Sequence, residues 1–154
     1  MASAPESLVR SFVAALNAHD PDRAVRQLAP DYRGVDISRS TTVVGRAEAQ
    51  EDLRAVQSAF SDLSMEIQTC VADGSQASVL WTLSGHHGGA CLHIPPTHRP
   101  VTLSGMALVT APDTHITQCV YQWDLAGFLR SVKLLPDLPD GNIEDIVPAL
   151  SPSP

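Results

Sequence analysis

A single carboxylate, Asp124, lies between a strand-like aromatic run and a helix-like apolar run in the segment Cys119-Val-Tyr-Gln-Trp-Asp-Leu-Ala-Gly-Phe-Leu. Side chains of an extended strand alternate between two faces, so Gln122 shares the face of Asp124 and the aromatic residues share the other. We expect the aromatic face to pack under helices and Asp124 to look into a concave, poorly solvated pocket. Burial disfavours a charged carboxylate, which would let Asp124 exchange protons with a bound substrate.

A second interpretation of Asp124 needs no chemistry. Aspartate is a preferred residue at the start of a helix, where its carboxylate accepts a hydrogen bond from an amide two or three residues later. Under this interpretation Asp124 only stabilises the helix that follows. The local sequence leaves both roles open.

Other polar and aromatic residues are candidates for the same pocket. His87, in the stretch Gly85-His-His-Gly88, could donate to a substrate carbonyl or serve as a structural residue bonded to a loop backbone. Gln122 is placed to bind a substrate oxygen. Trp81 and Met106 occupy strand positions where they either line an apolar pocket or fill the core.

An earlier strand adds two more candidates for substrate binding, Tyr32 and Asp36. Asp36 could also form an acid and base pair with Asp124, of the kind that activates water. The segment has no clear arginine to bridge two such carboxylates, so this stays a secondary hypothesis.

A metal or organic cofactor is not expected. One loop gathers possible zinc or copper ligands, but their irregular spacing and the Pro95-Pro96 pair fit no standard metal pattern; these ligands are His86, His87, Cys91, His93 and His98. The chain also has no glycine-rich phosphate loop, nucleophile elbow or dinucleotide fingerprint.

The elements that must position these residues can be read from periodicity and capping signals. Ser3-Ala-Pro-Glu6 is a capping box that predicts a helix over about 4–18, and Asp20-Pro21 begins a shorter helix that Pro30 stops. A third helix is predicted over about 46–60. Strands are predicted at 32–37, on both sides of an Asp73-Gly74 turn, and at about 101–110 and 115–123.

Helices therefore fill the first part of the chain and strands the next, which predicts an α+β fold. Three helices can cover one face of a curved antiparallel sheet, and the other face must curl around a small core or a cavity. One domain is predicted over 1–140, followed by a tail over 141–154 that is partly ordered or disordered.

Composition limits the partners. The 154 residues carry a net charge of −7 without a basic cluster, which argues against nucleic acid and against an anionic membrane surface. No apolar run is long enough for a membrane helix, and the N-terminus has no signal-peptide pattern. Three cysteines cannot all pair within one chain, so we expect a cytoplasmic protein.

Several linked stretches resemble the SnoaL-like polyketide cyclases of the nuclear-transport-factor-2-like superfamily, over about residues 6–140. They are Phe12-Val-Ala-Ala-Leu-Asn17, Leu28-Ala-Pro-Asp-Tyr32, Gly85-His-His-Gly88, Ile94-Pro-Pro-Thr97 with Arg99, and Trp123-Asp-Leu-Ala-Gly-Phe-Leu-Arg130. The resemblance implies a cone-shaped, curved antiparallel sheet, or half-barrel, that is covered by the three N-terminal helices and encloses one apolar pocket. Such proteins are often oligomeric, so a homodimer or homotetramer is expected. It also implies that Asp124 acts as general acid/base and that His87 matches the family's loop histidine.

The reaction implied by the resemblance is an intramolecular aldol closure of a carbonyl-bearing, polyketide-like apolar substrate, without metal or cofactor. The chain departs from the family pattern at Arg33-Gly34, at Cys119 and at Ser131-Val-Lys133. These departures keep two alternatives open: a SnoaL-like hydroxylase or epoxide- or ether-ring-forming enzyme, and a non-catalytic small-molecule-binding or dimer scaffold protein.

Overall fold

The computed structural model describes residues 1–138. In chain order its elements are α1 (Ala4–Asn17), α2 (Pro21–Val25), β1 (Leu28–Asp36), β2 (Thr41–Val44), α3 (Gly45–Ala59), β3 (Ser64–Asp73), β4 (Gln76–His86), β5 (Pro100–Thr110), β6 (Ile116–Trp123) and α4 (Leu125–Ser131). The predicted tail over 141–154 lies outside the described residues. The predicted domain limits therefore stay a prediction.

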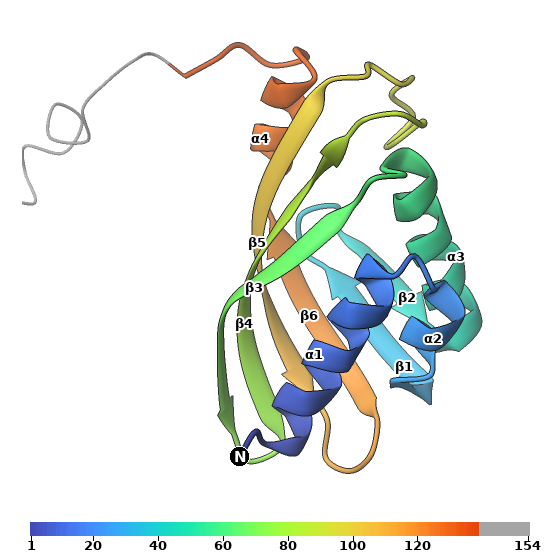
Figure 1. Cartoon of the computed structure of the whole chain (residues 1–154), viewed down its shortest axis with the longest axis vertical. Coiled ribbons are helices and arrows are strands. Elements are labelled where there is room, and N and C mark those ends of the chain that lie inside the picture. The colour runs from blue at the N-terminus through green and yellow to red at the C-terminus, as the bar shows by residue number, and fades with distance from the viewer. Residues whose placement is uncertain (139–154) are drawn as a thin grey trace, which may run out of the picture.

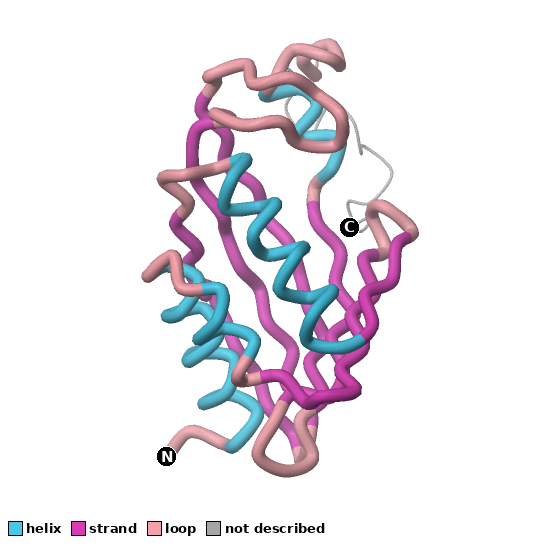
Figure 2. The backbone as a smooth tube through the Cα atoms, turned by 90° about the vertical axis from the view of Figure 1, so that its right-hand side faces the viewer, coloured by secondary structure: helices cyan, strands magenta, loops and turns pink. Residues whose placement is uncertain are grey.

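The six strands form one curled sheet in the order β2-β1-β6-β5-β4-β3, and α1, α2 and α3 cover one of its faces (Figure 1). The view in Figure 2, turned by 90°, shows the covering helices in front of the curved strands. The predicted α+β fold with three covering helices is confirmed. One detail of the prediction was wrong, because β1 and β6 pair in parallel while all other neighbouring strands are antiparallel.

The helix boundaries follow the capping signals of the sequence. The Ser3 hydroxyl accepts from the Glu6 amide at 3.3 Å, and the Asp20 carboxylate accepts from the Arg23 amide at 2.8 Å. The second helix is shorter than predicted, since Leu28 already pairs with Ile116 of β6. Pro30, predicted to stop the helix, instead lies in β1 where the β1–β6 register shifts, a site at which a missing amide is tolerated.

Apolar side chains gather in two neighbouring clusters between the helices and the sheet. One cluster packs α1 against β1 and β6 through Val9, Leu28 and Ile116. The other packs α4 and the end of α3 through Phe60 and Phe128. Among the helices of residues 1–138, none has the length and apolar character required to span a membrane.

Candidate active site

A cavity of about 260 Å³ lies between the covering helices and the inner face of the curled sheet. Its wall is largely apolar and is built from α1, α3 and all six strands. Among the residues that line it, only Asp36, Arg39 and Asp52 are charged. The predicted apolar pocket therefore exists, and its polar centre is formed by these three side chains.

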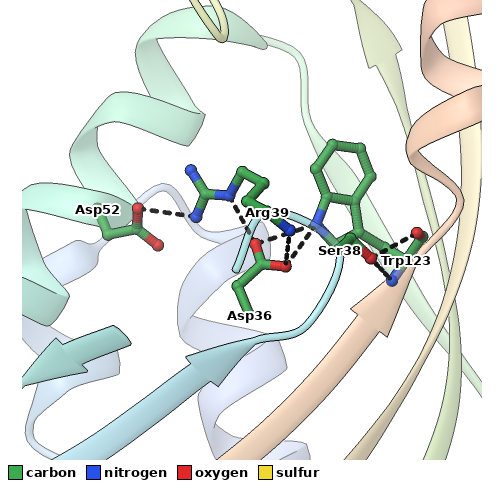
Figure 3. Close-up of polar contacts among 5 residues, drawn as sticks. All are labelled: Asp36, Ser38, Arg39, Asp52 and Trp123. Carbon is green, nitrogen blue, oxygen red and sulfur yellow. Dashed lines mark hydrogen bonds and ion pairs between the residues drawn. The ribbon is translucent and has the colours of Figure 1, made fainter. Parts of the chain in front are cut away.

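Asp36 ends β1 inside this cavity and is 2% exposed. The chain turns there, and the Asp36 carboxylate accepts from the backbone amide of Arg39 at 3.2 Å and from Arg39 Nε at 2.6 Å. A spacing of three residues across a turn thus brings the guanidinium back onto the carboxylate. Figure 3 shows Arg39 lying between Asp36 and a second acid, Asp52.

Asp52 comes from α3, on the opposite wall of the site. Arg39 Nη2 donates to Asp52 Oδ1 at 3.3 Å, and the second Asp52 oxygen has no hydrogen-bond partner within the described chain. Burial lowers the pKa of Arg39, but the Asp36 hydrogen bond and the charges of both acids outweigh this effect and raise the pKa overall. Arg39 is therefore a permanent cation held between two acids.

Trp123 fixes the other side of Asp36. Its indole Nε1 donates to both carboxylate oxygens at 3.1 and 3.2 Å. The backbone of Trp123 is itself held by Ser38, whose hydroxyl donates to the Trp123 carbonyl and accepts from the Trp123 amide, both at 2.8 Å. With three donors on one carboxylate, Asp36 is an anchor for Arg39 and has little capacity left for a ligand.

Two tyrosines line the cavity close to this centre. Tyr121 is the register partner of Asp36, and Tyr32 lies next to Cys119. Desolvation raises the pKa of both phenols, and the negative charge of Asp52 raises each further. Burial also raises the pKa of the Cys119 thiol to about 12. The phenols and this thiol are thus neutral at pH 7.

Trp81 forms part of the cavity wall because its strand partner is a glycine. Trp81 of β4 pairs with Gly105 of β5, and the indole lies over the glycine. A Cβ built at residue 105 would come within 2.1 Å of the Trp81 ring, closer than any real contact. Gly105 is therefore required for the observed position of the indole.

Of the predicted site residues, Tyr32, Asp36 and Trp81 line the cavity, but Asp124 does not. The predicted position of Asp124 in a dry pocket was wrong. Asp124 is exposed and caps α4, where it accepts from the Gly127 amide at 2.8 Å. Gly127 makes room for this cap, since a Cβ there would lie 2.2 Å from the Asp124 carboxylate.

Gln122 and Met106 also lie outside the cavity, on the outer face of the sheet, where they line a shallow open depression together with Asp124. Met106 is 60% exposed. The alternation of side chains was read correctly, but the cavity was assigned to the wrong face. The ligand-sized space lies between sheet and helices, on the side of Tyr121 and Trp123.

His87 is fully buried, yet it does not line the cavity. Its ring packs against Phe60 and Phe128, with ring centroids 5.9 and 5.6 Å apart. Nδ1 accepts from the Thr97 amide at 3.3 Å, which assigns the ring proton to Nε2. Within the described residues this buried Nε2 has no hydrogen-bond partner. This position supports the structural interpretation of His87.

The burial of His87 predicts an acid-sensitive fold. Desolvation lowers the pKa of His87, so the unfolded chain binds a proton near the ordinary pKa of about 6.5 while the folded chain does not. The free energy of unfolding should therefore fall as the pH drops below about 6.5, until the lower folded pKa is reached. Urea unfolding between pH 5 and 8 measures this slope.

His87→Asn is the matched control for the acid sensitivity, because an asparagine oxygen can replace Nδ1 as acceptor of the Thr97 amide. In His87→Asn the free energy of unfolding should depend less on pH. Its slope should be smaller by up to about 1.4 kcal/mol per pH unit, the value for one bound proton. Equal slopes in both proteins would contradict the assignment, whatever the absolute stability of the variant.

No group of three or more histidine, cysteine or acidic side chains suited to a metal occurs among residues 1–138. In the loop after β4, Cys91 contributes to the cavity wall, whereas His93 and His98 are exposed. The loop residues considered as metal ligands thus do not converge.

Sequence reasoning missed Arg39, Asp52 and Tyr121 as site residues. A signal existed for Arg39, since Asp36 and Arg39 are three residues apart across a turn next to a strand end. Asp52 precedes Leu53 on the apolar stripe of α3, which places it at the edge of the buried face. Only the packing of α3 over β1 brings the Arg39 and Asp52 side chains into contact.

The sequence profile of the family described as SnoaL-like polyketide cyclase matches residues 6–132. This range includes every element from α1 to α4 except the first two residues of α1. A comparison with curated protein sequences finds no match.

Solved structures from several Streptomyces species share this fold. AclR of Streptomyces galilaeus, a proposed hydroxylase, is 20% identical over 88% of this chain and 89% of its own, with a TM-score of 0.78. TsrD of Streptomyces laurentii is 26% identical over 86% of this chain and 96% of its own, with a TM-score of 0.76. IdmH of Streptomyces antibioticus, a proposed polyketide cyclase, is 19% identical over 84% of this chain and 98% of its own, with a TM-score of 0.73.

Proposed function

Because the chain belongs to the SnoaL-like polyketide cyclase family, we propose that it is a natural-product tailoring enzyme that transfers a proton on a carbonyl-bearing, largely apolar substrate. Cyclisation is the preferred reaction. The observation that carries the proposal is the Asp36–Arg39–Asp52 group in the wall of an otherwise apolar cavity, with Asp36 buried and the side chains of Arg39 and Asp52 only 26% and 30% exposed.

Each of the three charged residues has its own role in this proposal. Asp36, saturated by Arg39 and Trp123, holds the guanidinium in place. Asp52 has a free carboxylate oxygen and is the general base. Arg39 and the neutral hydroxyl of Tyr121 donate to the oxygen on which negative charge develops, and such preorganised donors are effective in a poorly hydrated site.

The proposed reaction balances without a further reactant. Asp52 removes a proton from the carbon next to a substrate carbonyl, and the electron pair moves onto the carbonyl oxygen to form an enolate. The enolate carbon attacks a second carbonyl of the same molecule and forms a carbon–carbon bond. The resulting alkoxide takes the proton back from Asp52, so the product is an isomer of the substrate.

Asp124 as the general base stays a prediction, but its exposed position as a helix cap gives that role no support. That the reaction needs no metal or organic cofactor also stays a prediction. A non-catalytic binding protein is the remaining alternative, and it predicts saturable binding without turnover.

Proton transfer can be tested with 1-tetralone, a neutral bicyclic ketone, dissolved in deuterium oxide. We expect the enzyme to accelerate deuterium incorporation at the carbon next to the carbonyl above the buffer rate, measured by NMR or mass spectrometry. Binding of the ketone without accelerated exchange would contradict the proposed proton transfer and favour the binding-protein alternative.

The bridge through Arg39 also favours a second candidate, a water-activating enzyme that opens an epoxide. Asp52 would take a proton from water while the water oxygen attacks an epoxide carbon and the carbon–oxygen bond of the ring breaks. The resulting alkoxide would then take this proton from Asp52. The bridging arginine missing from the sequence pattern is Arg39, and it joins Asp36 to Asp52 instead of to Asp124. Heavy oxygen from water in a diol product of 1,2-epoxytetralin would support this reaction, while label from dioxygen would indicate a hydroxylase.

Assembly and location remain predictions. The outer sheet face exposes Leu80, Met106 and Leu108 on adjacent strands, which is compatible with the predicted homodimer or homotetramer. A small apolar substrate as partner, the absence of nucleic-acid and membrane partners, and a cytoplasmic location are carried over unchanged.

A further inference from the structure

The tip of the loop between β4 and β5 forms part of the cavity wall. Residues 91–94 make a tight turn there, in which the Cys91 amide donates to the Ile94 carbonyl at 3.1 Å and the Ile94 amide donates to the Cys91 carbonyl at 2.8 Å. Cys91 and Leu92 line the cavity, whereas the next residue, His93, is exposed. This tip turn therefore lies between the cavity and the solvent.

The backbone of the tip turn is strained. Its two central residues both have a positive φ, 52° at Leu92 and 62° at His93. A two-residue turn of this kind normally contains Asn-Gly or Gly-Gly, because a Cβ crowds the backbone in the left-handed region. Bulky residues such as leucine are outliers there. Backbone strain persists only where the surroundings hold it, and it is often found in segments that switch between two conformations.

The base of the same loop is firmly fixed to the end of α3 (Figure 1). The Gly88 and Gly89 amides both donate to the Ala59 carbonyl, at 2.9 and 3.1 Å. Gly89 approaches α3 so closely that a Cβ on it would lie 2.2 Å from the Ser58 carbonyl oxygen. On the other side of the tip turn, the rings of Pro95-Pro96 fix the backbone φ. The part of the loop that is free to move is therefore the tip turn.

The tip turn is attached to the protein by apolar contacts. Apart from the two hydrogen bonds within the turn, residues 90–96 make none with the rest of the described chain. Cys91, Leu92 and Ile94 pack against the apolar cluster that contains Phe60 and Phe128. Such contacts are non-directional, so contacts with a ligand can replace them. The tip turn can thus leave its position without breaking a hydrogen bond to the described remainder of the chain.

The tip turn also lies close to the charged group of the cavity. Burial raises the pKa of the Cys91 thiol, and the positive charge of Arg39 partly opposes this effect. The guanidinium that joins Asp36 to Asp52 is therefore near the tip turn. Because the side chains of Arg39 and Asp52 are 26% and 30% exposed, a segment that shields them from water strengthens their electrostatic interactions.

We propose that the tip turn is a gate that regulates access to the cavity. In its open state Leu92 moves out of the cavity wall, and the two central residues leave the left-handed region. In its closed state the tip turn separates the charged group from water, as closing loops do in many enzymes. The gate rests on the proposed function in taking this cavity as the site, and it adds how a ligand enters and leaves.

His93→Gly tests the gate without altering a residue of the cavity wall. Glycine adopts the left-handed region without strain, so the substitution stabilises the closed turn whether or not a ligand is bound. The association and dissociation rate constants of 1-tetralone should therefore fall by the same factor, about threefold to tenfold, while Kd stays unchanged. Stopped-flow quenching of the fluorescence of Trp81 and Trp123, which both line the cavity, measures the two rate constants.

His19→Gly is the matched control, because His19 is also an exposed histidine with a positive φ, 54°, and lies outside the cavity wall. It should relieve a similar strain and leave both rate constants unchanged. Unchanged rate constants in His93→Gly would overturn the gate, as would a lack of 1-tetralone binding to the wild type. An equal effect of the two substitutions would overturn it too, since this would indicate a response to overall stability.

The Ile94 amide reports opening of the tip turn without any ligand. Its hydrogen bond to Cys91 lies within the turn. In the wild type we expect this amide to exchange with deuterium at least about 100-fold faster than the amides between β4 and β5. Equal protection would mean that the turn opens only when the whole fold opens, and it would contradict the gate.

Failure of the proposed function has a different signature. In that case 1-tetralone binds without accelerated deuterium exchange at the carbon next to its carbonyl. The gate is judged from the rate constants of binding and from exchange of the Ile94 amide, neither of which depends on proton transfer to or from the ketone.

Discussion

Asp52→Asn is expected to lower kcat/KM for deuterium exchange of 1-tetralone by about 10² to 10⁴-fold, the usual contribution of a general base. The substitution keeps the size of the side chain and an oxygen that can accept from Arg39 Nη2, so the guanidinium should stay in place. What is lost is the free carboxylate oxygen that takes the substrate proton. Steady-state exchange rates measured by NMR provide the comparison.

The control for this prediction is Asp124→Asn, which should change kcat/KM by less than about threefold. Asparagine is itself a good helix cap, so little stability should be lost. If Asp124→Asn abolishes exchange while Asp52→Asn does not, and both proteins are folded by circular dichroism, then Asp124 is the base. Such a result would mean that α4 rearranges when substrate binds.

Phe128→Ala is expected to lower the free energy of unfolding by about 3–5 kcal/mol, the usual cost of removing a buried phenyl ring. Phe128 is 0% exposed and lies among Phe60, His87 and Trp123, with ring centroids 5.6–6.2 Å away. Its removal leaves a cavity between α4, the loop after β4 and the end of α3. Urea unfolding followed by circular dichroism measures the loss.

Leu134→Ala serves as the control for Phe128→Ala, because Leu134 is 58% exposed and should contribute less than about 0.5 kcal/mol. A loss below about 1 kcal/mol for Phe128→Ala would show that α4 is not packed as described. Since Phe128 also contacts the Trp123 ring, the variant should in addition weaken the support of Asp36.

Local signals predicted most of the fold. The Ser3 and Asp20 caps, the Asp73-Gly74 turn and the apolar stripe of α3 each act within a few residues. They placed both ends of α1 and α3, the start of α2 and four of the strands close to the observed positions. The parallel pairing of β1 with β6 depends on contacts between distant segments, which periodicity does not encode. β2 is a short edge strand with mostly exposed residues and therefore gives little pattern.

The site was harder to predict than the fold, for two physical reasons. Alternation along β6 shows which residues share a face, but it does not show that the hollow lies on the aromatic face. The position of Asp124 before a helix fits a base and a cap equally well, although Gly127, three residues later, is compatible with the cap. Asp52 approaches Arg39 only through tertiary packing of α3.

The indole of Trp81 and the bare backbone of Gly105 constrain one another's evolution. A methyl group gained at residue 105 would force the indole to move, so the two positions should covary among relatives, with a smaller residue at 81 wherever 105 bears a side chain. For protein engineering, this pair is a suitable starting point for enlarging the cavity. Trp81→Leu removes side-chain volume from the cavity wall and leaves Asp36, Arg39 and Asp52 unchanged.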